Sequence, residues 1–147
     1  MKSCAFFGHG NLDYREYEEE IKNSIVDLIE NYDVAQFYTG GRGTFDSFCS
    51  RMVYKVKNYY PHIHNTLVLS YMPAKDWELP AQYDDSVYLL ETNVPPKYAI
   101  VRTNQLLIDK ADFVLTAVCR SWGGARTAHD YATRKKKLWK NIFDDKR

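Results

Sequence analysis

The sequence predicts an α/β domain, in which a mainly parallel sheet of about five or six strands is covered on both faces by helices in a three-layer, Rossmann-like arrangement. Apolar, strand-like runs alternate with segments of helical periodicity along the 147 residues, which is typical of parallel strands joined by helical crossovers. Glycine-rich turns follow the first, second and fifth expected strands. Ligands bind at this carboxyl edge in open α/β sheets, so the turns also indicate a site.

The first strand and helix follow from hydrophobic periodicity. Residues 3–7 form a short apolar run of the kind found in buried strands. Residues 14–31 then carry apolar side chains at helical spacing, which predicts an amphipathic helix. Asp13 and Glu16 have the spacing of a capping box, so we expect this helix to begin beside them.

The later elements are predicted on the same grounds, and the longest connection between them is irregular. Residues 72–85 contain two prolines, Trp77 and several charges without a helical period. This segment is either a lid or ligand-facing loop, or a surface excursion that packs Trp77 onto the body. Strands are expected at 34–38, 66–71, 86–90 and 112–118, with a short last strand at 138–143, and helices are expected at 45–59, 97–110 and 124–137.

Length and composition indicate one domain over residues 1–147, with 45% hydrophobic residues to form its core. The formal net charge is +1, which argues against a nucleic-acid partner. No signal peptide precedes the first strand and no apolar run reaches the roughly 20 residues that span a bilayer, so we expect a cytoplasmic protein without a membrane partner. Cys4, Cys49 and Cys119 lack metal-ligand spacing and are expected to be buried free thiols.

The glycine turn after the second strand is the most informative motif. It has the sequence Thr39-Gly40-Gly41-Arg42-Gly43-Thr44-Phe45-Asp46. A glycine turn between a strand and a helix leaves backbone N–H groups uncovered at the positive end of the helix, where a phosphate binds. Glycine permits both the sharp turn and the close approach of a ligand. The alternative is a tight turn that binds nothing.

Two further turns have the same character. Gly8-His9-Gly10-Asn11 follows the first strand, although the third glycine of a dinucleotide-binding fingerprint is absent. Ser121-Trp122-Gly123-Gly124-Ala125-Arg126-Thr127 follows the most apolar strand, at 112–118. A purely structural protein would not require this repetition, so the three turns together favour a ligand site.

Each candidate site residue has a ligand-binding interpretation and a structural alternative. Gly8, Gly10, Gly40, Gly41 and Gly43, with Asn11, Gly123 and Gly124 beside them, would present donors to a phosphate. Arg42 would neutralise the phosphate or point into solvent, and Thr44 would contact it or cap the helix. His9 lies between glycines, so we expect it to contact a base or phosphate rather than to be buried.

Two more candidates lie outside these glycines. Asn104 either reaches the ligand edge or belongs to the helix surface, and Trp122 either stacks on a base or simply packs. We interpret His62-x-His64 as a chance pair, so no metal site and no cofactor are predicted. Exposed aromatic residues make a homo-oligomer an expectation.

The residues Tyr38 to Asp46 resemble the Ser-Gly-Gly-x-x-Gly-Ile-Asp signature of DNA-processing proteins and the Pro-Gly-Gly-x-Gly-Thr-x-x-Glu signature of LOG nucleotide phosphoribohydrolases. Both groups belong to the SLOG (SMF/DprA–LOG) superfamily. Phe7-Gly8-His9-Gly10 is similar to the start of its small single-domain, YpsA-like members. The resemblance implies a Rossmann-like sheet and a nucleotide-type ligand above the glycine turns. The glutamate of the LOG signature is replaced by Ser47, and the acid nearest to it is Asp46.

Three functions follow from the residues and the resemblance. The first, which we favour, is binding of a nucleotide or nucleotide-derived signalling molecule without turnover, in a sensor, carrier or sequestering role. The second is an enzyme that hydrolyses the N-glycosidic bond of a nucleoside monophosphate, with Asp46 as the catalytic acid and Arg42 as the phosphate clamp. The alternative role of Asp46 is to cap the helix or to hold its own loop. The third, by analogy with DNA-processing proteins, is binding of single-stranded DNA, which the near-neutral charge disfavours.

Overall fold

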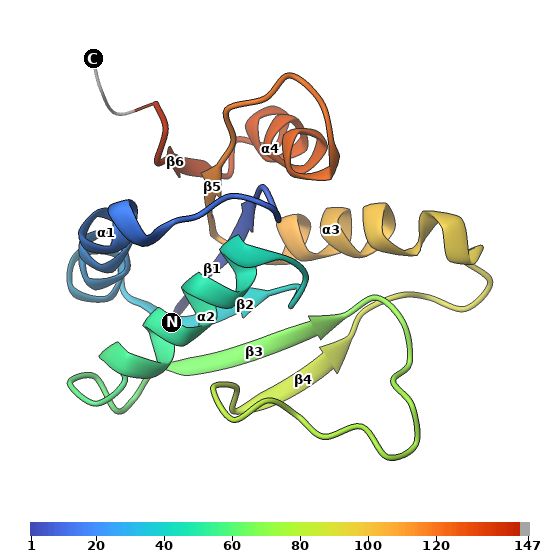
Figure 1. Ribbon diagram of the computed structural model, residues 1–147, viewed down its shortest axis with the longest axis horizontal. Helices are drawn as coiled ribbons and strands as arrows, with labels where there is room; N and C mark the ends of the chain where they lie inside the picture. The colour runs from blue at the N-terminus through green and yellow to red at the C-terminus, as the bar shows by residue number, and fades with distance from the viewer. Residues whose placement is uncertain (145–147) are drawn as a thin grey trace.

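A six-stranded parallel sheet with the strand order β4-β3-β2-β1-β5-β6 organises the computed structural model, which describes residues 1–144 (Figure 1). The strands are β1 (Lys2–Gly8), β2 (Val34–Thr39), β3 (His64–Leu69), β4 (Asp85–Tyr88), β5 (Phe113–Ala117) and β6 (Leu138–Asn141). The helices are α1 (Glu18–Asn31), α2 (Thr44–Val56), α3 (Ala99–Lys110) and α4 (Gly124–Arg134), with short 3-10 turns at Arg15–Tyr17 and Pro96–Tyr98. The predicted three-layer α/β fold is confirmed.

The two faces of the sheet have separate cores, because side chains alternate along each strand. On β1, Cys4 and Phe6 belong to the core under α1 and α2, whereas Ala5 and Phe7 belong to the core under α3 and α4. All four side chains are at least nine-tenths buried. A strand covered on both faces must be apolar throughout, which explains why 3–7 is recognisable in the sequence as one continuous run.

The chain reverses its direction across the sheet at β1. From β1 it proceeds through β2 and β3 to β4 on one side, and then returns to place β5 and β6 on the other side. The connections that leave β1 and β5 therefore diverge, which opens a crevice at the carboxyl edge between these strands. The end of β1 lies level with the end of β5, since Gly8 pairs with Ala117.

Two local predictions are wrong. Asp13 does not cap α1: its carboxylate accepts the backbone N–H of Arg15 at 3.0 Å and pairs with the Arg15 guanidinium. A 3-10 turn follows, and α1 begins at Glu18 without a side-chain cap. Cys119 is exposed rather than buried because β5 ends at Ala117, although Cys4 and Cys49 are buried free thiols as predicted.

The connection between β3 and β4 is irregular, as predicted, and Figure 1 shows it as a long loop beside the sheet. Residues 70–84 form no helix or strand. Over residues 1–144, none of the helices has the length and apolar character needed to cross a membrane.

Candidate functional site

Three adjoining cavities follow the carboxyl edge of the sheet. The central cavity, of about 140 Å³, lies against Gly8, Gly40, Arg42, Asp46, Asn104 and Gly124. A cavity of about 300 Å³ lies beside it at the start of α4, and we call it the α4 cavity. A third, of about 330 Å³, lies toward β3 and includes Trp77, so we call it the Trp77 cavity. The central cavity shares Gly8 and Gly124 with the α4 cavity and shares Gly40 and Arg42 with the Trp77 cavity.

Asp46 is a buried carboxylate in the first turn of α2 that lines the central cavity. Its Oδ2 accepts the backbone N–H of Arg42 at 3.0 Å, and only 8% of the residue is exposed. Burial raises the pKa of this carboxyl to about 6, although the Arg42 amide and the Arg42 charge both lower it. A group with such a pKa changes its charge close to neutral pH, which is common at functional sites.

Arg42 lies between the central cavity and the Trp77 cavity. Its guanidinium donates to the carbonyl of Gly40 at 3.3 Å and to the hydroxyl of Ser70 at 3.1 Å. A Cβ built on Gly40 would lie 3.1 Å from Nη2 of Arg42, so the glycine makes room for the folded-back side chain. The guanidinium is therefore held over the end of β2 instead of pointing into solvent.

The glycine turns after β1 and β2 pack directly against each other. A Cβ on Gly43 would lie 2.4 Å from the Cα of Gly10, and Gly43 has a φ of 91°. The backbone N–H of Thr44 donates to the carbonyl of Gly10 at 3.0 Å, and its hydroxyl donates to the carbonyl of Leu12 at 2.5 Å. Of the two alternatives for Thr44, capping of α2 by its side chain is not observed, because its hydroxyl ties two loops together.

Close packing also accounts for two other glycines. A Cβ on Gly8 would lie 2.4 Å from the ring of Phe45, and a Cβ on Gly41 would lie 2.4 Å from Cδ1 of Leu67. By contrast, a Cβ on Gly124 would meet no heavy atom within 4 Å. The glycines after β1 and β2 thus allow close packing against neighbouring backbone and side chains, whereas the start of α4 keeps open space in front of it.

His9 is buried, contrary to the prediction, with only 4% of the residue exposed. Its Nε2 accepts the backbone N–H groups of Cys119 at 3.0 Å and Arg120 at 3.2 Å. Burial lowers the pKa of His9, and the Arg120 charge lowers it further. The imidazole is therefore neutral, and it joins the loop after β1 to the loop after β5 rather than offering Nε2 to a ligand.

The start of α4 is the most open helix end at the site. Gly123 precedes the first turn with a φ of 98°, and this turn contains no acidic residue. Arg120 lies beside it, donates to Oδ1 of Asn11 at 2.9 Å, and places its guanidinium 5.2 Å from the ring centroid of Trp122. The helix end and the Arg120 charge together give the α4 cavity a positive character.

Several residues that line these cavities are not among the predicted site residues. Arg120 lies three residues after the end of β5, and its place just beyond an apolar strand was a usable signal. Ser70, Gln82 and Tyr83 line the Trp77 cavity but belong to the irregular connection, whose path the sequence does not indicate.

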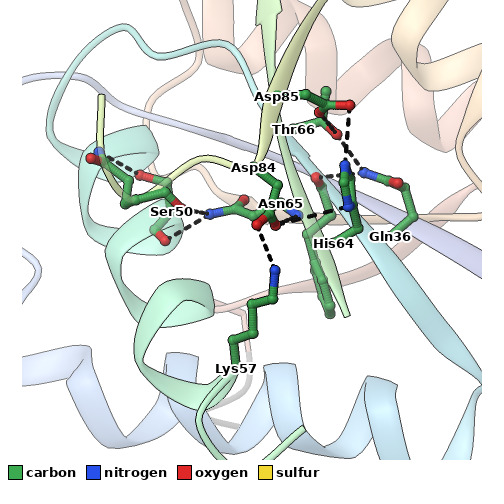
Figure 2. Close-up of polar contacts among 10 residues, drawn as sticks. Gln36, Ser50, Lys57, His64, Asn65, Thr66, Asp84 and Asp85 are labelled. Atoms are coloured by element: carbon green, nitrogen blue, oxygen red, sulfur yellow. Dashed lines mark hydrogen bonds and ion pairs between the residues drawn. The ribbon is translucent and has the colours of Figure 1, made fainter. Parts of the chain in front are cut away.

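His64 lies at the opposite, amino edge of the sheet, at the start of β3 (Figure 2). Its Nε2 is 3.1 Å from Asp85 and its Nδ1 is 3.9 Å from Asp84. Among residues 1–144, no group of three histidine, cysteine or acidic side chains has an arrangement that would hold a metal ion.

Solved structures share this architecture, although no protein-family model and no curated protein sequence matches the chain. DNA processing protein A from Streptococcus pneumoniae superposes with a TM-score of 0.68 at 11% identity, over 95% of this chain and 50% of that protein. The chain has the fold of the matched half of DNA processing protein A. It spans about half the length of the streptococcal protein, so the likeness concerns this fold and not the whole of that protein.

Two further structures agree with this assignment. DNA processing protein A from Helicobacter pylori, which binds single-stranded DNA, superposes with a TM-score of 0.64 at 15% identity, over 95% of this chain and 64% of that protein. A protein named TM1055 superposes with a TM-score of 0.57 at 16% identity, over 94% of this chain and 72% of that protein. The Rossmann-like fold that the SLOG resemblance implied is thus confirmed.

Proposed function

We propose that the chain binds a nucleotide or nucleotide-derived signalling molecule at the carboxyl edge of its sheet. The observation that carries this proposal is the convergence of Arg42, Asp46, Asn104 and Gly124 on the central cavity. Arg42 lies in the loop after β2, Asp46 and Gly124 lie in the first turns of α2 and α4, and Asn104 lies on α3. The cavity also adjoins the point between β1 and β5 where the strand order reverses, which is where open α/β sheets bind nucleotides.

The phosphate is assigned to the α4 cavity rather than to the start of α2. Asp46 already occupies the first turn of α2, and a phosphate about 5 Å from an ionised carboxylate would be repelled by about 3 kcal/mol at an effective dielectric constant near 20. The first turn of α4 has no acid, leaves open space at Gly124, and has Arg120 beside it. Backbone N–H groups and a nearby arginine are the usual partners of a phosphate.

The sugar is assigned to the central cavity, next to Asp46 and Asn104. An ionised carboxylate accepts hydrogen bonds from hydroxyl groups, and an amide both donates and accepts, so this pair suits a ribose. Hydrogen bonds from the sugar hydroxyls would offset part of the desolvation cost of the buried carboxylate. This explains why an acid at this cavity is compatible with an anionic ligand whose phosphate lies farther along the edge.

A second candidate function is hydrolysis of the N-glycosidic bond of a nucleoside monophosphate. It is favoured by one observation: Asp46 is buried at the cavity and has a pKa of about 6, which suits a general acid near neutral pH. Asp46→Asn would then abolish release of free base while it preserves binding. Unchanged release of base by this variant would exclude the role.

Single-stranded DNA is the third candidate, because DNA processing protein A from Helicobacter pylori binds it. The formal net charge of +1 argues against this partner, since neutralisation of phosphates drives such binding. An affinity for an oligonucleotide that falls steeply with salt would support this candidate, and a salt-independent affinity would exclude it.

The test is a thermal-shift panel of nucleoside mono-, di- and triphosphates, NAD, cyclic ADP-ribose-type molecules and a short oligonucleotide. A ligand at 100 times its Kd should stabilise the fold by about 2.7 kcal/mol. Gly124→Asp should remove this stabilisation, because it places a negative charge at the open start of α4 where nothing crowds the new side chain. Asn58→Asp, in the turn after α2, adds the same charge at the amino edge and should preserve the shift.

Absence of a shift with every nucleotide would contradict the proposal, and so would equal shifts in Gly124→Asp and the unaltered chain. Incubation of a stabilising ligand, followed by detection of free base, separates binding from hydrolysis.

A further inference from the structure

The Trp77 cavity has aromatic and aliphatic walls and a few polar groups. Tyr71, Trp77 and Tyr83 contribute rings, and Leu67 and Leu69 contribute aliphatic surface. Ser70 and Gln82 also line the cavity and offer a hydroxyl and an amide to an occupant. A volume of about 330 Å³ falls within the range of small-molecule pockets, whose typical lining is of this kind. These features suit a planar ring with hydrogen-bonding groups on its edge.

Side-chain bonds hold the walls of this cavity in place. The hydroxyl of Tyr83 and the hydroxyl of Thr39 share a buried hydrogen bond of 2.7 Å, which fixes the ring against the end of β2. The hydroxyl of Tyr71 donates to the carbonyl of Pro96 at 2.9 Å, which ties this ring to the turn before α3. Tyr71 and Tyr83 are therefore held in position without a ligand to organise them.

A partly buried polar cluster anchors the end of the same connection (Figure 2). The side-chain amide of Asn65 donates to the carbonyl of Gln82 at 2.9 Å and to the carbonyl of Ser50 at 3.1 Å. Asp84 accepts the backbone N–H of Asn65 at 2.8 Å and pairs with Lys57 at 2.5 Å. The segment thus leaves the cavity on a fixed path into β4.

We infer that the Trp77 cavity takes the nucleobase of a nucleoside 5′-phosphate. This inference rests on the proposed function, which assigns the phosphate to the α4 cavity and the sugar to the central cavity. The three cavities adjoin in that order, and Arg42 and Gly40 line both the central cavity and the Trp77 cavity. A nucleotide laid along the edge therefore brings its base to Trp77.

Trp122 is the competing aromatic platform, and the geometry favours Trp77. The Trp122 side of the edge is where Arg120 and the start of α4 attract the phosphate, and Arg120 lies over the Trp122 ring. Trp122 is 65% exposed, whereas Trp77 is 38% exposed and lines its cavity together with Tyr71 and Tyr83. A base in the Trp77 cavity can contact several rings and aliphatic side chains, which removes more apolar surface from water than a contact with one exposed ring does.

The test compares Trp77→Ala with the matched variant Trp122→Ala in calorimetric titrations. The probes are AMP, GMP, CMP and UMP, with ribose 5-phosphate as the analogue that lacks a base. Trp77→Ala should weaken binding of at least one nucleoside monophosphate on the order of tenfold, the loss expected for one stacked base, without changing the affinity for ribose 5-phosphate. Trp122→Ala should change the nucleotide affinity less than threefold, and Trp77→Phe should restore most of it.

Three results would overturn the inference, and they are distinguishable. If the unaltered chain binds a nucleotide and Trp77→Ala binds it equally well, the base does not occupy the Trp77 cavity, although the proposed function stands. If Trp122→Ala alone loses affinity, the ligand lies in the reverse orientation. If no nucleoside monophosphate binds the unaltered chain, this inference fails, and the thermal-shift panel with its wider set of nucleotides decides whether the proposed function fails as well.

Discussion

Asp46→Asn should stabilise the folded chain at pH 8. Burial raises the pKa of Asp46 from its usual 3.8 to about 6, so the folded state binds this proton more tightly than the unfolded state does. Stability is therefore greatest below the unfolded pKa, and it falls as the pH rises from 3.8 to about 6. A difference of about two pH units corresponds to about 3 kcal/mol at most, since each unit is worth about 1.4 kcal/mol.

The asparagine removes the buried charge but keeps an oxygen that can accept the Arg42 N–H. It also removes the attraction between the carboxylate and the Arg42 guanidinium, so we expect a gain of about 1–3 kcal/mol at pH 8 and almost none at pH 4. Urea unfolding at both pH values measures this difference. Asp76→Asn, at an exposed position, is the matched control and should change the free energy of unfolding by less than about 0.5 kcal/mol.

A loss of stability in Asp46→Asn at pH 8, or an equal gain at both pH values, would refute this reasoning. The predicted result has a functional meaning as well. A buried acid that destabilises the fold is the kind of local inconsistency expected where a site needs a particular group.

Three further predictions concern the same edge. Gly43→Ala should lower the free energy of unfolding by about 2 kcal/mol or more, because the φ of Gly43 is 91° and the new Cβ would lie 2.4 Å from the Cα of Gly10. The control variant Gly124→Ala should change the free energy of unfolding by less than about 1 kcal/mol, because its new Cβ would meet no heavy atom within 4 Å. Urea titrations of the two variants check this difference. His9→Ala should lower the free energy of unfolding by about 2 kcal/mol at pH 7.5, because two backbone N–H groups lose their acceptor. Since the folded pKa of His9 is lowered, the stability that it contributes is full above the unfolded pKa near 6.5 and is lost as the pH falls, so the loss should be smaller at pH 5. An equal loss at both pH values would count against this reasoning. The affinity for a ribose-containing ligand should fall about tenfold from pH 7.5 to pH 5 as Asp46 protonates. The control is Asp46→Asn, in which any change of affinity with pH reports the titration of the phosphate alone, and the fall should exceed that change. Identical pH profiles of the two chains by calorimetry would exclude a contact between Asp46 and the sugar.

The fold was predictable because its central strands, such as β1 and β5, are buried on both faces. Residues 3–7 and 112–118 are nearly continuous apolar runs, and they became β1 and β5 with shifts of one residue. The start of α1 was wrong because Asp13 has a local alternative that spacing does not exclude, a turn closed by the backbone of Arg15. Such short-range competition depends on geometry that a sequence pattern does not contain.

The candidate site was predictable in its place but not in its internal arrangement. Glycine turns after parallel strands must meet at one edge, so Gly8, Gly40 and Gly124 were expected close together, and they line one cavity. The sequence could not indicate that Gly10 packs on Gly43. A single sequence does not distinguish a glycine that makes room for a ligand from a glycine that makes room for another segment of backbone. The roles of residues that meet only in space could be found only from the structure.

Amide chemical-shift mapping tests the central claim most directly. A nitrogen-15-labelled sample would be titrated with the nucleotide that gives the largest thermal shift. We predict that the amides of Gly8, Gly40 and Gly124 at the carboxyl edge shift with the ligand, while those of Asn65 and Asp84 at the amino edge stay in place. Shifts concentrated at the amino edge, or no shifts with any nucleotide, would contradict the proposal that this edge is a nucleotide site.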